Sequence, residues 1–88
     1  MPMSVIRVIP VLRVFDVAKA REFYLDYLGC EVDFEHRFGE NFPLFMQVSR
    51  DGLVLRLSEH HGDGSPGANV SIEMAGLDDL HRELTTKD

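Results

Sequence analysis

The chain has 88 residues, of which 44% are hydrophobic and 27% charged, and a formal net charge of −6. This composition is typical of one small folded domain and is too apolar for a disordered chain. The longest apolar run, at residues 8–12, is far shorter than the roughly 20 residues of a membrane-spanning helix, and the N-terminus has no secretory signal pattern. The single cysteine, Cys30, cannot form an internal disulfide, so we expect a cytoplasmic protein without a membrane partner.

The charges are not arranged to bind nucleic acid. The 9 basic residues form no cluster or stripe among the 15 acidic ones, whereas a phosphate backbone is held by clustered cations. At long range the net negative charge attracts cationic ligands and repels anionic ones. The alternative is that this charge only keeps the protein soluble.

The first predicted elements are a strand and a helix. Residues 5–15 are rich in Val, Ile and Leu, and Pro10 among them indicates an edge strand, because proline cannot donate a ladder hydrogen bond. Asp16 fits a helix N-cap, and Gly29 fits the residue after a helix end. Between them, apolar residues recur at helical spacing and predict a helix over 17–28. These residues are Val17, Ala20, Phe23, Tyr24, Tyr27 and Leu28.

Three further strands are predicted, over 30–35, 44–49 and 53–58. Asp51-Gly52 between the last two is a strong signal for a two-residue hairpin turn. The register that it sets pairs Val48 with Leu55, Met46 with Leu57, Gln47 with Arg56, and Phe45 with Ser58. One face of the hairpin is then aliphatic and should pack under the helix, whereas the other face is mixed and free to line a site.

The remaining residues resemble the start of the chain. Residues 61–68 are rich in turn formers and predict a linker, and residues 70–74 then predict a strand. Three leucines after it share one face of a helix, and this strand and helix match the first ones at an offset of 60 residues. We therefore predict an α+β fold with a βαβββ module over 1–60 and the first βα of a second module over 69–88, in which two sheets curve around a groove. The three leucines are Leu77, Leu80 and Leu84.

One set of motifs is distinctive as a group. It comprises residues 9–17, Ala20, Phe23-Tyr24, Asp26 and Leu28-Gly29. The set resembles the vicinal-oxygen-chelate superfamily, which includes glyoxalase I, bleomycin resistance proteins and extradiol dioxygenases, and the stretch over 28–34 is most similar to the bleomycin resistance proteins. A complete domain of that superfamily has two βαβββ modules, so the resemblance implies that the second module lacks its last strands here.

The resemblance also implies where the metalloenzymes of this superfamily hold their metal. Their ligand positions align with Ile9, Arg56 and, within about one residue, Asn69, where those enzymes have His, Gln or Glu. Isoleucine cannot ligate a metal, and the fixed charge of arginine opposes a cation. The resemblance therefore implies a member without a metal or other cofactor, like the bleomycin-resistance branch, which sequesters its ligand without turnover.

The candidate site is a groove lined by the mixed face. Asp33 and Glu35 on one strand face offer carboxylates, and nearby phenylalanines offer aromatic surface for a cationic ligand. The alternatives are solvated carboxylates, and Phe38 and Phe42 as loop residues packed under the sheet edge. The predicted ligand-binding residues are Arg13, Asp33, Phe38, Phe45, Gln47 and Arg56.

Two other features favour structural roles. His60-His61, beside Glu59 and Asp63, lack the spacing of metal ligands and predict a solvated turn. Cys30 at an apolar strand start predicts a small buried hydrophobe, because no histidine can be placed near it to form a catalytic dyad. We expect no catalytic residues.

The expected function is metal-independent binding of a small molecule, as in bleomycin-type antibiotic resistance. The alternatives are a glyoxalase-like metal-dependent lyase or dioxygenase-family enzyme, which would contain a stoichiometric divalent metal, and a non-functional fragment. The strand at 70–74 would lack its sequence neighbours, and exposed strand edges pair with other chains. We therefore expect a homodimer or higher oligomer in which a partner supplies the missing wall, unless the sequence is truncated.

Overall fold

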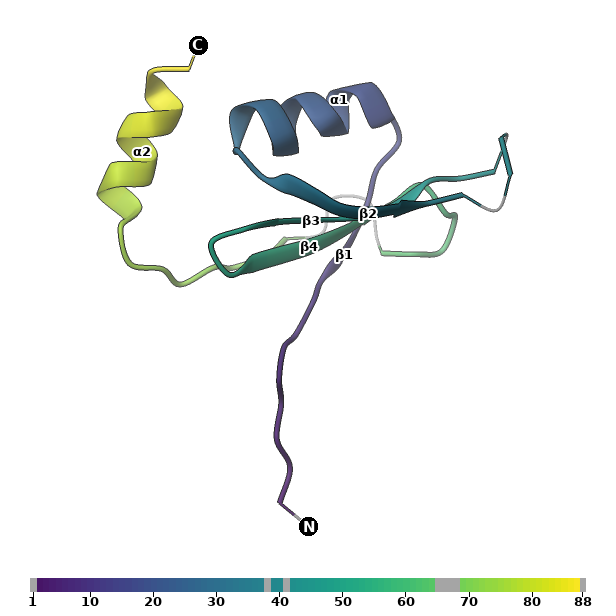
Figure 1. Cartoon of the computed structure of the whole chain (residues 1–88), viewed down its shortest axis with the longest axis horizontal. Helices are drawn as coiled ribbons and strands as arrows, with labels where there is room; N and C mark the ends of the chain where they lie inside the picture. The colour runs from purple at the N-terminus through teal and green to yellow at the C-terminus, as the bar shows by residue number, and fades with distance from the viewer. Residues whose placement is uncertain (1, 38, 41, 65–68, 88) are drawn as a thin grey trace.

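The computed structural model of the chain describes residues 2–37, 39–40, 42–64 and 69–87. A four-stranded sheet carries a helical layer on one face, a second helix lies beyond one end of the sheet, and an extended N-terminal arm projects from the other side (Figure 1). The strands are β1 (Val11–Arg13), β2 (Glu31–His36), β3 (Phe45–Arg50) and β4 (Leu53–Ser58). Their order is β1-β4-β3-β2, with β1 parallel to β4 and the other pairs antiparallel. This mixed sheet with helices confirms the predicted α+β class.

The helical layer begins at the predicted N-cap. A side-chain oxygen of Asp16 accepts a hydrogen bond of 3.0 Å from the backbone N–H of Lys19. The helix α1 (Val17–Arg21) continues directly into η1 (Glu22–Tyr27), where the turns widen to a π-helix, and Gly29 follows the helix end with a φ of +80°. The predicted helix and both of its terminal signals are therefore confirmed.

The widened turn changes which side chains face the sheet. The prediction placed Phe23 and Tyr27 on the apolar stripe, but Phe23 is 50% exposed and Leu25 packs against the core instead. A π-helix bonds residues five apart rather than four, so it rotates every later side chain relative to the spacing of an α-helix. Phe23 and Tyr27 stack on each other on the outside of the helix, with ring centroids 5.7 Å apart.

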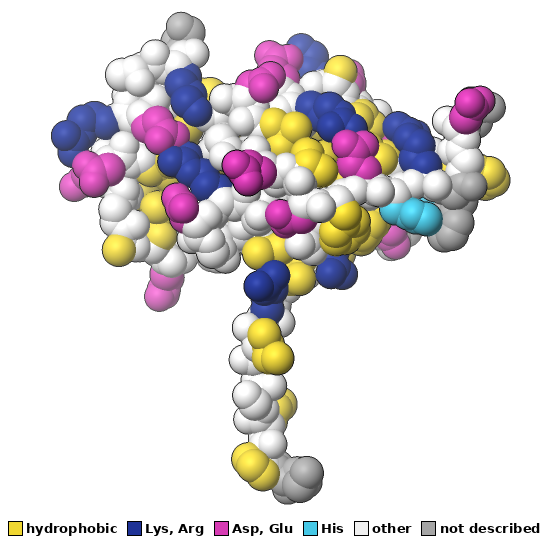
Figure 2. All heavy atoms as spheres, in the orientation of Figure 1, with side chains coloured by type: hydrophobic (Ala, Val, Ile, Leu, Met, Phe, Trp, Pro, Cys, Tyr) yellow, Lys and Arg dark blue, Asp and Glu magenta, His cyan; other side chains and the backbone are white. Residues whose placement is uncertain are grey.

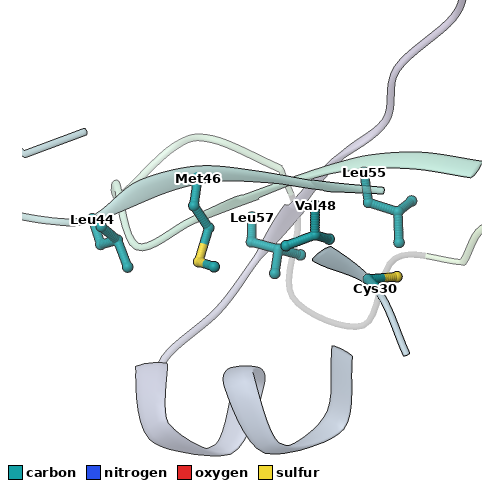
Figure 3. Packing of buried hydrophobic residues seen from close by; sticks show 6 residues of the cluster. All are labelled: Cys30, Leu44, Met46, Val48, Leu55 and Leu57. Atoms are coloured by element: carbon teal, nitrogen blue, oxygen red, sulfur yellow. The ribbon is translucent and has the colours of Figure 1, made fainter. Parts of the chain in front are cut away.

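The β3–β4 hairpin has the predicted register at every predicted pair. Asp51 and Gly52 have φ values of 48° and 92°, which are the left-handed conformations that a tight hairpin turn requires. The aliphatic face packs under the helical layer as predicted, and Figure 3 shows its side chains between the strands and the helix. Cys30 is buried among them, which confirms its predicted role. The cluster comprises Cys30, Leu44, Met46, Val48, Leu55 and Leu57.

Two predicted strands are shortened or absent. The strand expected over 5–15 is reduced to β1, which lies at the sheet edge as Pro10 indicated, and the arm before it is extended and exposed (Figure 1). Residues 70–74 form no strand. An extended segment becomes a strand only when a neighbouring strand pairs with its N–H and C=O groups, and no described part of this chain does so for either segment. The prediction of two sheets around a groove was therefore wrong for the described residues, which form one sheet with an open face.

The predicted second helix is present as α2 (Leu77–Thr85), and polar contacts hold it. Two terminal nitrogens of Arg50 donate to the two carboxylate oxygens of Glu83 at 2.7 and 2.8 Å. Lys87 Nζ donates to the backbone oxygen of Tyr27 at 2.8 Å, at the end of η1. No residue of α2 is fully buried, so its leucine face is not part of the core. Neither helical segment of the described chain is long and apolar enough to cross a bilayer.

Candidate ligand-binding face

The candidate site lies on the sheet face opposite the helical layer, which we call the open face. No described helix or strand covers it. Side chains of paired residues share a face, so the register places Arg13 of β1 and Arg56 of β4 there together with alternate residues of β3. Where the N-terminal arm leaves the body, Figure 2 shows basic side chains next to hydrophobic ones. The open face carries Arg13, Asp33, Phe34, Phe45, Gln47, Ser49 and Arg56.

A chain of hydrogen bonds crosses three strands of this face. Arg56 Nε donates to Gln47 Oε1 at 3.0 Å, and Gln47 Nε2 donates to Asp33 Oδ2 at 3.0 Å. Ser49 Oγ donates to the second oxygen of Asp33 at 2.8 Å. Gln47 is only 9% exposed, yet both ends of its amide have partners. The sequence predicted Gln47 opposite Arg56. The structure extends that pair into a connected row from Arg56 through Gln47 to Asp33, which we call the polar floor.

Asp33 acts on this face as an acceptor of internal hydrogen bonds. The donors Gln47 and Ser49 lower the pKa of its carboxyl, and the charge of Arg7 on the arm lowers it further. The group is therefore ionised near neutral pH, with a protein donor on each oxygen. A general acid or base needs a pKa close to the working pH, so Asp33 is poorly suited to proton transfer.

The predicted shared face of Asp33 and Glu35 was wrong. A β-bulge in β2 shifts the pairing register between Val32 and Phe34. The extra residue puts Asp33 and Phe34 together on the open face and turns Glu35 toward the helical side, where Arg21 donates to it at 2.7 Å. Strict alternation could not reveal this, because the bulge leaves no mark in a period-two pattern.

The bulge also adds an aromatic pair that the sequence reasoning missed. The rings of Phe34 and Phe45 stack with centroids 6.3 Å apart and an interplanar angle of 29°. The guanidinium carbon of Arg56 lies 5.9 Å from the centroid of the Phe34 ring. Phe34 is 41% exposed, so this pair offers a flat apolar surface beside the polar floor.

Most predicted site residues meet on the open face. Arg13, Asp33, Phe45, Gln47 and Arg56 all lie there. Phe38 lies outside the described residues. Phe42 is in the loop before β3 and is exposed, so it does not pack under the sheet edge.

The histidine-rich segment forms the predicted turn. Ser58 Oγ donates to Asp63 Oδ2 at 2.9 Å and accepts from the backbone N–H of His60 at 3.0 Å. Within the described ranges, no group of three or more His, Cys, Asp or Glu side chains could hold a metal ion. At the positions that the family resemblance assigns to metal ligands, Arg56 presents a guanidinium bonded to Gln47, and Ile9 is apolar. These residues do not fit a metal ion.

Comparison with known proteins identifies the family. The model of a family described as "Glyoxalase superfamily protein" matches residues 2–88. The chain belongs to the glyoxalase superfamily. This membership confirms the resemblance seen in the motifs of the first strand and helix. No curated protein matches the sequence of the chain.

Solved structures of the superfamily share the fold. The chain is similar to the bleomycin-binding protein of bleomycin-producing Streptomyces verticillus, solved with copper(II)-bleomycin, at 30% identity and a TM-score of 0.71, over 98% of this chain and 66% of that one. A glyoxalase/bleomycin resistance protein from Streptomyces sp. CB03234 gives 20% identity and a TM-score of 0.68, over 89% and 70%. The protein SMU.1112c gives 20% and 0.61, over 97% and 75%. The last two support the fold alone.

Proposed function

We propose that this glyoxalase-superfamily chain binds a small molecule on its open face and holds it without chemical turnover. The observation that carries the proposal is the fixed polar floor from Arg56 through Gln47 to Asp33, next to the exposed Phe34–Phe45 pair. Small-molecule sites combine apolar and aromatic surface with a few precisely held polar groups. The similar Streptomyces verticillus protein binds bleomycin, which supports a ligand binder of the bleomycin-resistance type.

The side chains favour binding over catalysis. Both oxygens of Asp33 are engaged by protein donors and its pKa is lowered. Cys30 is buried on the opposite side of the sheet, and burial raises the pKa of its thiol, so it is a poor nucleophile. Arg56 opposes a cation at an implied metal position, so the proposed binding is independent of metal.

Membership of the superfamily favours one alternative, a metal-dependent lyase or dioxygenase. Such an enzyme would purify with a stoichiometric divalent metal. Elemental analysis of the purified chain distinguishes the two functions: we expect no metal at full occupancy, and a 1:1 content of a divalent metal would favour the enzyme.

We further propose that a second copy of the chain completes the site as a homodimer. Apolar side chains are exposed on the arm, in the segment before α2 and at the first residue of α2. Burying such surface between copies is a common origin of symmetric dimers. The exposed apolar residues are Met3, Val5, Ile6, Val8, Val70, Ile72, Met74 and Leu77.

Calorimetric titration with metal-free and copper(II)-bleomycin tests the binding function. We expect saturable binding that Phe34→Ala weakens at least about tenfold, because the ring would lose its stacking surface. Phe23→Ala is the matched control, since Phe23 is similarly exposed and also stacks on a neighbouring ring, but lies on the outside of the helix. Equal weakening by both variants would contradict the open face as the site, and no binding of either form would exclude bleomycin as the ligand.

A further inference from the structure

On the open face, the hydrogen-bond acceptors have partners within the protein, whereas several arginine donors have none among the described residues. Its acceptors have protein donors: both oxygens of Asp33 are engaged, and Asp63 at the edge accepts from Ser58. Its guanidinium groups have few acceptors. Arg56 uses its Nε on Gln47, and no described group accepts from its terminal nitrogens.

Arg13 is the clearest case. Its Nε is the one buried side-chain nitrogen or oxygen, among the residues that the structure describes, without a hydrogen-bond partner. Its guanidinium lies 4.6 Å from the centroid of the Phe15 ring, and no described acid forms an ion pair with it. A buried donor without a partner is unfavourable, and the terminal nitrogens of Arg13 are not buried and have no acceptor among the described residues. The guanidinium can therefore take an acceptor from outside the chain through its terminal nitrogens.

The two arginines are placed to act together. Arg56 pairs with Val11 across the parallel β1–β4 ladder, and Arg13 lies two residues further along the same face. Strand spacing and rise put their Cα atoms about 8 Å apart, which two arginine side chains can span to reach one group. Two carboxylates of this face are exposed: Asp33, whose two oxygens accept from Gln47 and Ser49, and Glu31, which is paired with Ser49 at the other end of β2.

We infer that the ligand of the open face is a planar organic anion, whose carboxylate, phosphate or sulfate accepts hydrogen bonds from Arg13 and Arg56 while its ring lies on Phe34 and Phe45. The inference rests on the proposed function but does not depend on bleomycin as the ligand. It differs from the cationic ligand expected from the net charge of −6. Net charge acts at long range, whereas unpaired donors on the binding surface decide which group is held.

Three probes with one ring test the charge of the ligand: 2-naphthoate, neutral 2-naphthamide and cationic 2-naphthylmethylammonium. Each is titrated into the ¹⁵N-labelled chain, and backbone amide and arginine Nε–H signals are followed. We expect naphthoate to bind at least tenfold more tightly than the ammonium probe, with the naphthamide between them. The naphthoate should shift the Nε–H signals of Arg13 and Arg56. This comparison needs no variant.

Two variants then test whether Arg13 causes the preference for the anionic probe. Arg13→Gln should weaken naphthoate at least tenfold and leave naphthamide within twofold, whereas Arg82→Gln should change neither, since Arg82 pairs only with Asp79 on the exposed side of α2. If naphthamide or the ammonium probe binds the open face as tightly as naphthoate, the anion inference is wrong and the binding function stands. If no probe shifts any open-face signal, the proposed function fails as well.

Discussion

Gln47 shows how single residues fix the floor of the open face. A buried amide without partners would destabilise the fold by about 1–3 kcal/mol, and here both ends are satisfied. Arginine can only donate and an ionised carboxylate can only accept, so the amide oxygen must face Arg56 and the amide nitrogen must face Asp33. The order of donors and acceptors therefore allows one orientation, which presents the same polar surface to every ligand.

The Ser49 hydroxyl is predicted to hold the pKa of Asp33 down. Ser49→Ala removes one of the two donors that lower this pKa, so it should rise toward the ordinary aspartate value of 3.8. Following the Asp33 side-chain carbon by NMR through an acid titration measures the change. The pKa of Glu83, held by Arg50 on another part of the molecule, serves as the control and should not move. An unchanged Asp33 titration would show that the hydrogen bond does not persist in solution.

At this scale the sequence predicted part of the site. Asp51-Gly52 fixed the hairpin register, and the register fixed Gln47 opposite Arg56. Phe34 could not be predicted, because its face depends on one unpaired residue in β2. A bulge is decided by how neighbouring strands fit together, and the alternation of Val32, Asp33 and Phe34 contains no information about that fit.

Among the elements, the β3–β4 hairpin is central, because it is hydrogen-bonded on both sides and carries most of the core. The helix α2 contributes no fully buried residue. Sequence reasoning predicted both elements and their apolar faces, but apolar spacing alone did not distinguish the leucines that pack in the core from those that stay exposed.

The same substitution at two leucines tests this difference. Leu57, on β4, is fully buried, whereas Leu77, on α2, is 61% exposed. Leu57→Ala should lower the free energy of unfolding by about 2–5 kcal/mol, because it leaves a cavity under the helix. Leu77→Ala should change it by less than about 0.5 kcal/mol. Urea denaturation measures both, and similar losses would mean that α2 packs more tightly than the structure shows.

The attachment of α2 is predicted to depend on pH. Hydrogen bonds from Arg50 lower the pKa of Glu83 below its ordinary value of 4.5. Because the folded pKa is the lower one, the ion pair supports docking above pH 4.5 and is lost as the pH falls through the lowered value. Gly29 leaves room for the Arg50 side chain in this ion pair. A Cβ at position 29 would lie 3.2 Å from an Arg50 nitrogen, and the left-handed φ of this residue also favours glycine.

Glu83→Gln should release α2 at every pH. We expect faster hydrogen exchange in α2 and unchanged exchange in the β3–β4 hairpin, and the wild type should show the same change only on acidification. Asp79→Asn is the control, because the ion pair of Asp79 is with Arg82, within α2 itself. Protection of α2 that persists in Glu83→Gln would show that apolar contacts hold the helix.

The whole molecule is less compact than its length predicts. Its radius of gyration is 14.6 Å, against about 12 Å expected for a compact chain of this length. The arm and α2 extend from opposite sides of the sheet (Figure 1). The sequence predicted strands over 5–15 and 70–74, that is, in the arm and in the segment before α2, and the apolar side chains there suit a strand. What they lack, among the described residues, is a strand to pair with.

A homodimer is the predicted solution state. Light scattering at low micromolar concentration should give twice the chain mass of 10.0 kDa. Ile6, 94% exposed on the arm, would be covered in such a dimer, so Ile6→Asp should shift the protein toward monomer. Ser4→Asp adds the same charge to the same arm and should have the smaller effect. A folded wild-type monomer would show that the exposed apolar surface has another role.

Mapping where a small molecule binds is the most direct test that the open face is the ligand site. The ¹⁵N-labelled chain is mixed with neutral 2-naphthamide, which reports the binding surface whatever the charge preference, and its backbone amide shifts are mapped. We predict that the largest shifts fall on Phe34, Phe45 and Gln47, with Phe23 and Tyr27 unaffected. Shifts confined to the outer surface of the helix, or absent throughout the sheet, would contradict the assignment of the ligand site to the open face.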